Sequence, residues 1–129
     1  MSNINSFEDL DCWKASRQLR LWVARDVLPA LPKDEKYRLG DQLLRAARST
    51  TANIAEGYGR FHYLDNAKYG SNARGSCYEV LDHLITAADE GLISQEKLEN
   101  GRELVLVAVK LLNGYLHYLQ NASKQTSNS

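Results

Sequence analysis

The chain has 129 residues, of which 43% are hydrophobic and 25% are charged, and this balance excludes an intrinsically disordered or fibrous protein. Its 16 Lys and Arg residues are matched by 16 Asp and Glu residues, so the formal net charge is zero. A protein that coats nucleic acid through bulk positive charge is thereby excluded, whereas a local basic patch is not. The length suits one domain, whose core needs no metal or disulfide for stability.

The sequence shows no targeting signal and no metal-binding motif. Its start, MSNINSFEDL, has neither the basic segment nor the apolar run of a secretory signal, and no apolar stretch is long enough to span a membrane. Cys12 and Cys77 lie within periodic apolar patterns, which predicts buried free thiols in a reducing compartment. No cluster of Cys and His has ligand spacing, so we expect neither a metal nor another cofactor. These features predict a soluble cytoplasmic protein.

The first half of the chain predicts two helices. Proline occurs only at positions 29 and 32 and β-branched runs are scarce, so we expect an all-α protein. The first helix is expected to start within residues 6–11 and to run to about residue 28, with Ser6 and Asp9 spaced as a helix cap. The second is expected over about 34–58, with Gly59 in a left-handed conformation just past its end.

The second half predicts two further helices, over about 64–90 and 94–121. Gly91 is expected to end the third helix and Ser94 to cap the fourth. Small residues gather at the end of the second helix and in the first half of the third, so these faces can approach closely and compensate the cost of Gly57 inside a helix. Residues 1–121 are therefore expected to form the domain, and the polar residues 122–129 a disordered tail.

Apolar residues cover more than one side of the first and fourth helices. In the first helix, Trp13 lies on a second apolar side, and the fourth contains the run ELVLVAVKLLNGYLHYL. Such coverage indicates burial beyond that of one small bundle. Together with the short connections, it predicts an antiparallel, up-down-up-down four-helix bundle that self-associates.

Catalysis is not indicated by the polar residues. Asn53, Glu56, Glu79 and His83 show no spacing of a nucleophile and its base. The pattern EGYGRF closes one helix before another instead of following a strand, so it is not a dinucleotide or phosphate loop. We therefore expect a non-enzymatic protein.

A structural polar network is the interpretation that we favour for these residues. The second and third helices are expected to run side by side around Gly59, which brings residues 53–56 level with 73–79. Buried polar groups require partners, and Arg74 is a candidate. The predicted network comprises Asn53, Glu56, Ser76 and Glu79.

Basic residues are concentrated in the centre of the chain. Residues 36–76 contain seven Lys and Arg against three acids, whereas residues 77–103 contain two against seven. Arg38, Arg45 and Arg48 share a side of the second predicted helix, opposite its apolar stripe. This pattern predicts a basic face able to contact phosphate or an acidic partner, with an ordinary solvated face as the alternative.

Three segments resemble a known family. They are SFEDLDCWKASRQL, ARSTTANIAEGYGR and ARGSCYEVLDHL, and the resemblance spans residues 7–120. They are similar to bacterial four-helix-bundle proteins encoded by intervening sequences in large-subunit ribosomal RNA genes. The accessory variability protein of diversity-generating retroelements is a related member. The positions shared with the family are Arg48, Asn53, Glu56, Gly57, Gly59, Arg60, Arg74, Gly75, Ser76 and Glu79.

The resemblance implies a homopentameric ring, and for the retroelement protein it implies binding of nucleic acid and of a reverse transcriptase through basic surfaces. With the basic segment, it leads to the expectation of an oligomeric protein that binds RNA or DNA. The expected phosphate contacts are Arg38, Arg45, Arg48, Arg60 and Arg74. Two alternatives remain open: an adaptor that docks a partner such as a reverse transcriptase, and an oligomeric scaffold with no ligand.

Overall fold

The computed structural model describes residues 3–128, and within this range the protein is all-helical, with no strand. Four long helices are accompanied by short helical segments near the first connection. This confirms the prediction of an all-α protein. The elements in chain order are η1 (Phe7–Asp9), α1 (Asp11–Trp22), the π-helical η2 (Val23–Val27), η3 (Leu28–Ala30), η4 (Glu35–Tyr37), α2 (Leu39–Tyr58), α3 (Tyr63–Asp89) and α4 (Gln95–Asn128).

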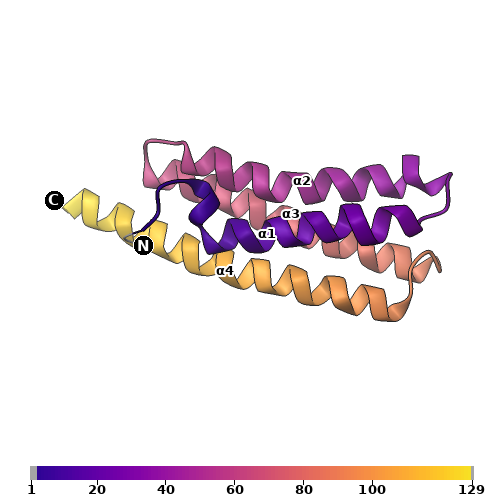
Figure 1. The fold of residues 1–129 in the computed structure, drawn as a ribbon. Coiled ribbons are helices and arrows are strands. Elements are labelled where there is room, and N and C mark those ends of the chain that lie inside the picture. Colours follow the sequence, from indigo (N-terminus) through magenta and orange to yellow (C-terminus); the bar gives the residue numbers. More distant parts are fainter. Residues whose placement is uncertain (1–2, 129) are drawn as a thin grey trace.

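The four helices lie side by side, and their connections alternate between the two ends of the molecule (Figure 1). Each helix contacts its neighbours in sequence, and α1 also packs against α4, which closes the group into a bundle. The contact between α2 and α3 is the most extensive. Residues distant in the sequence are thereby placed on common faces.

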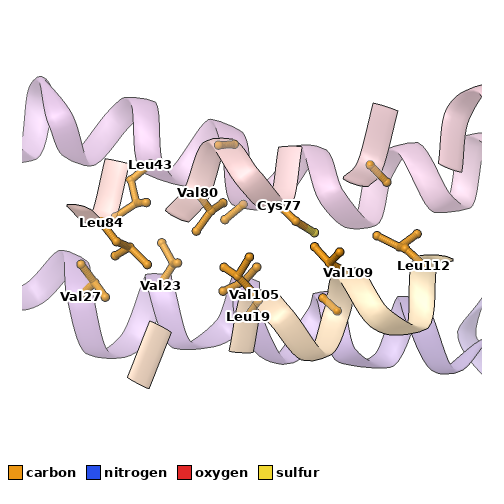
Figure 2. Packing of buried hydrophobic residues seen from close by; sticks show 14 of the residues in the cluster. Leu19, Val23, Val27, Leu43, Cys77, Val80, Leu84, Val105, Val109 and Leu112 are labelled. Carbon is orange, nitrogen blue, oxygen red and sulfur yellow. The ribbon is translucent and has the colours of Figure 1, made fainter. Parts of the chain in front are cut away.

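The core runs along the axis of the bundle. Every long helix contributes aliphatic side chains to it, and Figure 2 shows several of them pointing into the shared interior. Complete burial of each such side chain contributes about 1.5–3 kcal/mol to stability. Fully buried examples from the four helices and η2 include Leu19, Val23, Val27, Leu43, Leu84, Val105 and Leu112.

The ends of α2 and α3 approach each other closely at Gly57. A Cβ atom on this buried glycine would lie 2.7 Å from Asn66 Oδ1 and 2.9 Å from the Asn66 carbonyl oxygen, both on α3. Only a residue without a Cβ fits such a distance, so the packing offsets the conformational cost of glycine in a helix. The predicted compensation is confirmed.

The predicted caps and stops are mostly confirmed. Ser6 and Asp9 form a reciprocal capping box, although it precedes the 3₁₀ turn η1 and not α1 itself. The Lys97 amide donates to Ser94 Oγ at 3.0 Å, and Gly91 has a φ of 72°. The prediction for Gly59 is wrong, because its φ is −76°. Its amide continues the helical pattern by donating to the Ala55 carbonyl, so no left-handed residue is needed.

Two helix boundaries differ from those expected. The second helix starts at Leu39, because η4 and the irregular backbone of Arg38 interrupt the preceding segment. At the other end of the chain α4 continues to Asn128, although a disordered tail was expected over 122–129. No proline or glycine follows Gly114, and extending an existing helix costs little because it is already nucleated. Ser129 lies outside the described residues.

Candidate nucleic-acid interface

The outer face of α2 carries unpaired cations. Arg38 precedes the helix, and Arg45 and Arg48 lie on it opposite buried positions such as Leu43 and Ala47. All three arginines are exposed, and their side chains form no ion pair or hydrogen bond with any residue between 3 and 126. Asp41 is exposed on the same helix and moderates the positive charge without pairing with it. Unpaired guanidinium groups remain available to bind phosphate.

A groove between α1 and α2 extends this basic face. Its volume is about 460 Å³, and the described residues that line it include no acid. Arg20 Nη1 crosses from α1 to donate to Thr51 Oγ1 at 2.7 Å, which places this guanidinium beside Arg48 in the groove. The lining residues are Phe7, Trp13, Arg20, Arg48, Thr51, Ala52 and Ala55.

Aromatic rings stand at one end of the groove. Trp13 packs edge-on against Phe7 with a centroid separation of 5.4 Å, and the guanidinium of Arg17 lies 6.0 Å from the centroid of the Trp13 ring. Arginines interleaved with aromatic rings can bind nucleic acid by combining phosphate contacts with stacking. The sequence predicts Trp13 only as part of an apolar face, and it does not single out Arg17 or Arg20. The spacing of four and then three residues between Trp13, Arg17 and Arg20, which places them along one side of the helix, was the available signal.

Arg60 occupies a different place. Its Nη2 lies 2.9 Å from Glu56 Oε2 and donates to the Tyr69 hydroxyl at 2.7 Å, while its guanidinium stacks 4.7 Å from the Tyr69 centroid. The 20 residues of α2 span about 30 Å, so Arg60 and Arg38 lie at opposite ends of the helix. The five predicted arginines therefore do not form one patch.

Arg74 connects two helices. It is half-buried on α3, and its Nη1 donates to Asn113 Oδ1 on α4 at 2.8 Å. This contact lies on the α3–α4 side of the bundle, away from the groove between α1 and α2. The structure therefore gives Arg74 a role in helix packing, and phosphate binding by this residue stays a prediction.

The predicted polar network divides into separate parts. Asn53 Nδ2 donates to the carbonyl oxygen and to Oγ of Ser49, at 2.9 Å each, and Ser49 Oγ lies 2.9 Å from Ser76 Oγ. Asn53 and Ser76 are thus linked through Ser49. Glu56 and Glu79 do not join them, because each is more than half exposed and pairs with a residue four positions later in the chain. The partners of these two carboxylates are Arg60 and His83.

Both cysteines lie in the core of the bundle. Cys12 and Cys77 are free and buried, as predicted, and burial raises the pKa of Cys12 to about 12 and that of Cys77 to about 11.

Within the described part of the chain, no three His, Cys, Asp or Glu residues are grouped so that they could hold a metal ion. No described helix is sufficiently long and apolar to cross a membrane.

Known proteins share this fold and most of this sequence pattern. A crystal structure from Bacteroides thetaiotaomicron VPI-5482, of a protein with unknown function from the S23 ribosomal protein family, is similar with a TM-score of 0.74 and 19% sequence identity. The match covers 81% of this chain and 97% of that chain, and at such identity it shows the fold alone. Comparison with curated proteins finds no match. The sequence model described as 23S rRNA-intervening sequence protein matches residues 8–114. The chain therefore belongs to the 23S rRNA-intervening sequence protein family.

Proposed function

We propose that this protein is a non-enzymatic, oligomeric nucleic-acid-binding protein whose phosphate contacts lie on the α1–α2 face. The observation that carries the proposal is the set of unpaired arginines on α2, continued by the acid-free groove that contains Arg20 and Arg48. A protein with zero net charge gains such a face only by segregating its charges. The link between the family and intervening sequences of 23S rRNA favours RNA over DNA as the ligand.

The proposal includes the arrangement of the helices and their assembly. We infer an antiparallel, up-down-up-down bundle whose copies form a ring, which repeats the α1–α2 face around the assembly. Exposed apolar side chains on α4 support self-association, since Leu106 and Val107 are each 49% exposed. The buried free thiols agree with a reducing cytoplasmic environment.

A mobility-shift assay with structured RNA and DNA across a salt series tests the function. Replacing Arg38, Arg45 and Arg48 together by Gln is expected to weaken binding, because three phosphate contacts are removed. The slope of log K against log salt should become shallower by about 2 for a single-stranded ligand. The matched control replaces three exposed lysines on α3 and α4 by Gln, and it should change the slope much less. These are Lys68, Lys110 and Lys124. Absent or salt-independent binding by the wild-type protein would refute the proposal.

A second proposal is that the protein acts as an adaptor in a retroelement setting, as its similarity to the accessory variability protein suggests. The exposed apolar residues of α4 suit a protein partner such as a reverse transcriptase. A pull-down from cells that contain such an enzyme distinguishes the two proposals. A partner that stays bound after nuclease treatment supports the adaptor, and one that is released supports nucleic-acid binding.

A further inference from the structure

A second pocket lies at the end of the bundle where α2 passes into α3. The N-terminal segment and the C-terminal half of α4 reach the same end (Figure 1). The volume of the pocket is about 290 Å³, near the lower limit for small-molecule sites, which are roughly 300–1,000 Å³. It is separate from the α1–α2 groove, with which it shares no lining residue. The proposed phosphate contacts on α2 do not use it.

Aromatic rings form much of its wall. Phe61 is 94% exposed, and Tyr63 and Tyr118 are 41% and 42% exposed. Tyr118 stacks with Tyr115 at a centroid separation of 6.4 Å, and Phe61 meets His62 edge-on at 5.0 Å. Phe61 has one of the most exposed apolar side chains in the described chain, and core packing does not explain its position. Exposed ring faces around a hollow favour a flat, aromatic ligand.

Tyr115 and Arg60 offer hydrogen-bond donors to the pocket, whereas Asn66 Oδ1 is a buried acceptor with no partner among the described residues. The buried Tyr115 hydroxyl accepts a hydrogen bond from Asn66 Nδ2 at 2.8 Å, and burial raises the pKa of Tyr115 to about 12, so the hydroxyl keeps its proton. Within the described residues that proton has no acceptor. Glu56 and Tyr69 hold Arg60 through Nη2 alone, which leaves Nη1 and Nε available. None of the described residues that line the pocket is acidic. A ligand with an acceptor on its ring and a negative charge beside it would match these donors.

We propose that this pocket binds one unstacked nucleotide of a single-stranded RNA segment. The base lies against the aromatic wall, an acceptor of the base receives the Tyr115 hydroxyl proton, and the phosphate binds Arg60. A base within a duplex could not enter, because its faces and its Watson–Crick edge are occupied. The inference deepens the proposed function and rests on it: the α1–α2 face would bind the RNA backbone by charge, and the pocket would select an unpaired nucleotide.

Fluorescence of 2-aminopurine riboside 5′-monophosphate tests the pocket directly, because stacking on an aromatic ring quenches this probe. Titration with the full-length protein should quench the fluorescence with a saturating profile. Phe61→Ala should weaken binding about tenfold through the loss of stacking. Since Phe61 is almost fully exposed, this substitution leaves the core intact. Tyr37→Ala, which removes another exposed ring outside the pocket, is the matched control and should bind as the wild type does.

Tyr115→Phe separates the hydrogen bond from the packing. It removes only the hydroxyl and should weaken probe binding roughly three- to tenfold, the range for one hydrogen bond. Circular dichroism is measured in parallel to verify folding. If the wild type does not quench the probe, or if Phe61→Ala binds it like the wild type, the pocket proposal is overturned. Loss of self-association in Phe61→Ala with unchanged quenching would also overturn it, because a second copy would then cover the ring.

The triple arginine variant of the α1–α2 face distinguishes failure of the pocket proposal from failure of the proposed nucleic-acid-binding function. The protein with Arg38, Arg45 and Arg48 replaced by Gln should bind RNA more weakly and with a shallower salt dependence, and it should still quench the monophosphate. An RNA hairpin with 2-aminopurine in its loop, compared with the same base in its stem, provides the second readout. Quenching of the loop base alone supports the pocket. Equal responses from loop and stem contradict it, even where the RNA itself binds.

Discussion

At the scale of single residues, burial controls protonation at three side chains. The pKa values of Cys12, Cys77 and Tyr115 are raised by desolvation, because their charged forms are disfavoured inside the bundle. The two thiols are therefore unreactive in the folded protein at neutral pH, since the thiolate is the nucleophile. The Tyr115 phenol remains a hydrogen-bond donor over the same range.

These shifts predict a loss of stability at alkaline pH. Each group has a higher pKa in the folded protein than in the unfolded chain, so the folded state retains protons that the unfolded state releases. The full stability is present below about pH 9, the ordinary pKa of a thiol, and falls as pH rises toward 11–12. Between pH 9 and pH 10.5 the unfolded chain releases its thiol protons while the folded protein keeps them. Each thiol should therefore lower the free energy of unfolding by about 1–2 kcal/mol at pH 10.5.

Urea titrations at pH 8 and pH 10.5 measure this effect. The double variant Cys12→Ala, Cys77→Ala is less stable at both values because it leaves cavities, but its stability should change less between them. An equal pH dependence in the variant and the wild type would show that the thiols are not responsible.

At the scale of elements, the α2–α3 contact depends on small residues. Gly57 lies against the backbone of Asn66. Around Gly75, also within a helix, the described residues place no atom within 4 Å of its would-be Cβ, apart from the adjoining residues and backbone of its own helix. The two glycines therefore provide a matched pair in which helix propensity is the same and packing differs.

Gly57→Ala should destabilise the protein by about 1–3 kcal/mol, since the new methyl group forces the helices apart. Gly75→Ala should stabilise it by about 0.5–1 kcal/mol, because alanine is the better helix former on an open surface. Chemical denaturation followed by circular dichroism at 222 nm gives both values. A Gly57→Ala variant as stable as the wild type would refute the close packing described at this site.

At the scale of the whole molecule, the exposed apolar side chains of α4 bear on assembly. Leu106 and Val107 are adjacent on the outside of the bundle, and each is half exposed. An isolated bundle would leave this apolar area in water, which is unfavourable by about 25 cal/mol per Å². Contact with another copy would remove it.

Light scattering at micromolar concentration should give a mass that is a multiple of 14.5 kDa. Replacing Leu106 and Val107 together by Glu should lower this mass towards that of one chain, because charges cannot be buried unpaired at an interface. Tyr37→Glu, an equally polar change at an exposed ring outside α4, should leave it unchanged. A wild-type mass of 14.5 kDa would rule out self-association, and an intact assembly in the double variant would place the interface elsewhere.

Local features of this protein were predictable from the sequence because nearby residues determine them. The capping box of Ser6 and Asp9, the cap at Ser94 and the stop at Gly91 each depend on atoms within a few positions along the chain. The exposure of Arg45 and Arg48 followed from helical periodicity, since they lie opposite an apolar stripe.

Only the tertiary structure decided which residues meet across helices. The partners of Arg74 and Arg20, the link from Asn53 through Ser49 to Ser76, and both pockets depend on the register between helices far apart in sequence. A shift of one helical turn moves a side chain by about 5.4 Å and changes every such contact, yet it leaves the amphipathic pattern of each helix intact. The sequence by itself thus determined four amphipathic helices and several of their caps and stops. Packing of the whole chain determined which arginines are unpaired and where the aromatic rings surround a pocket.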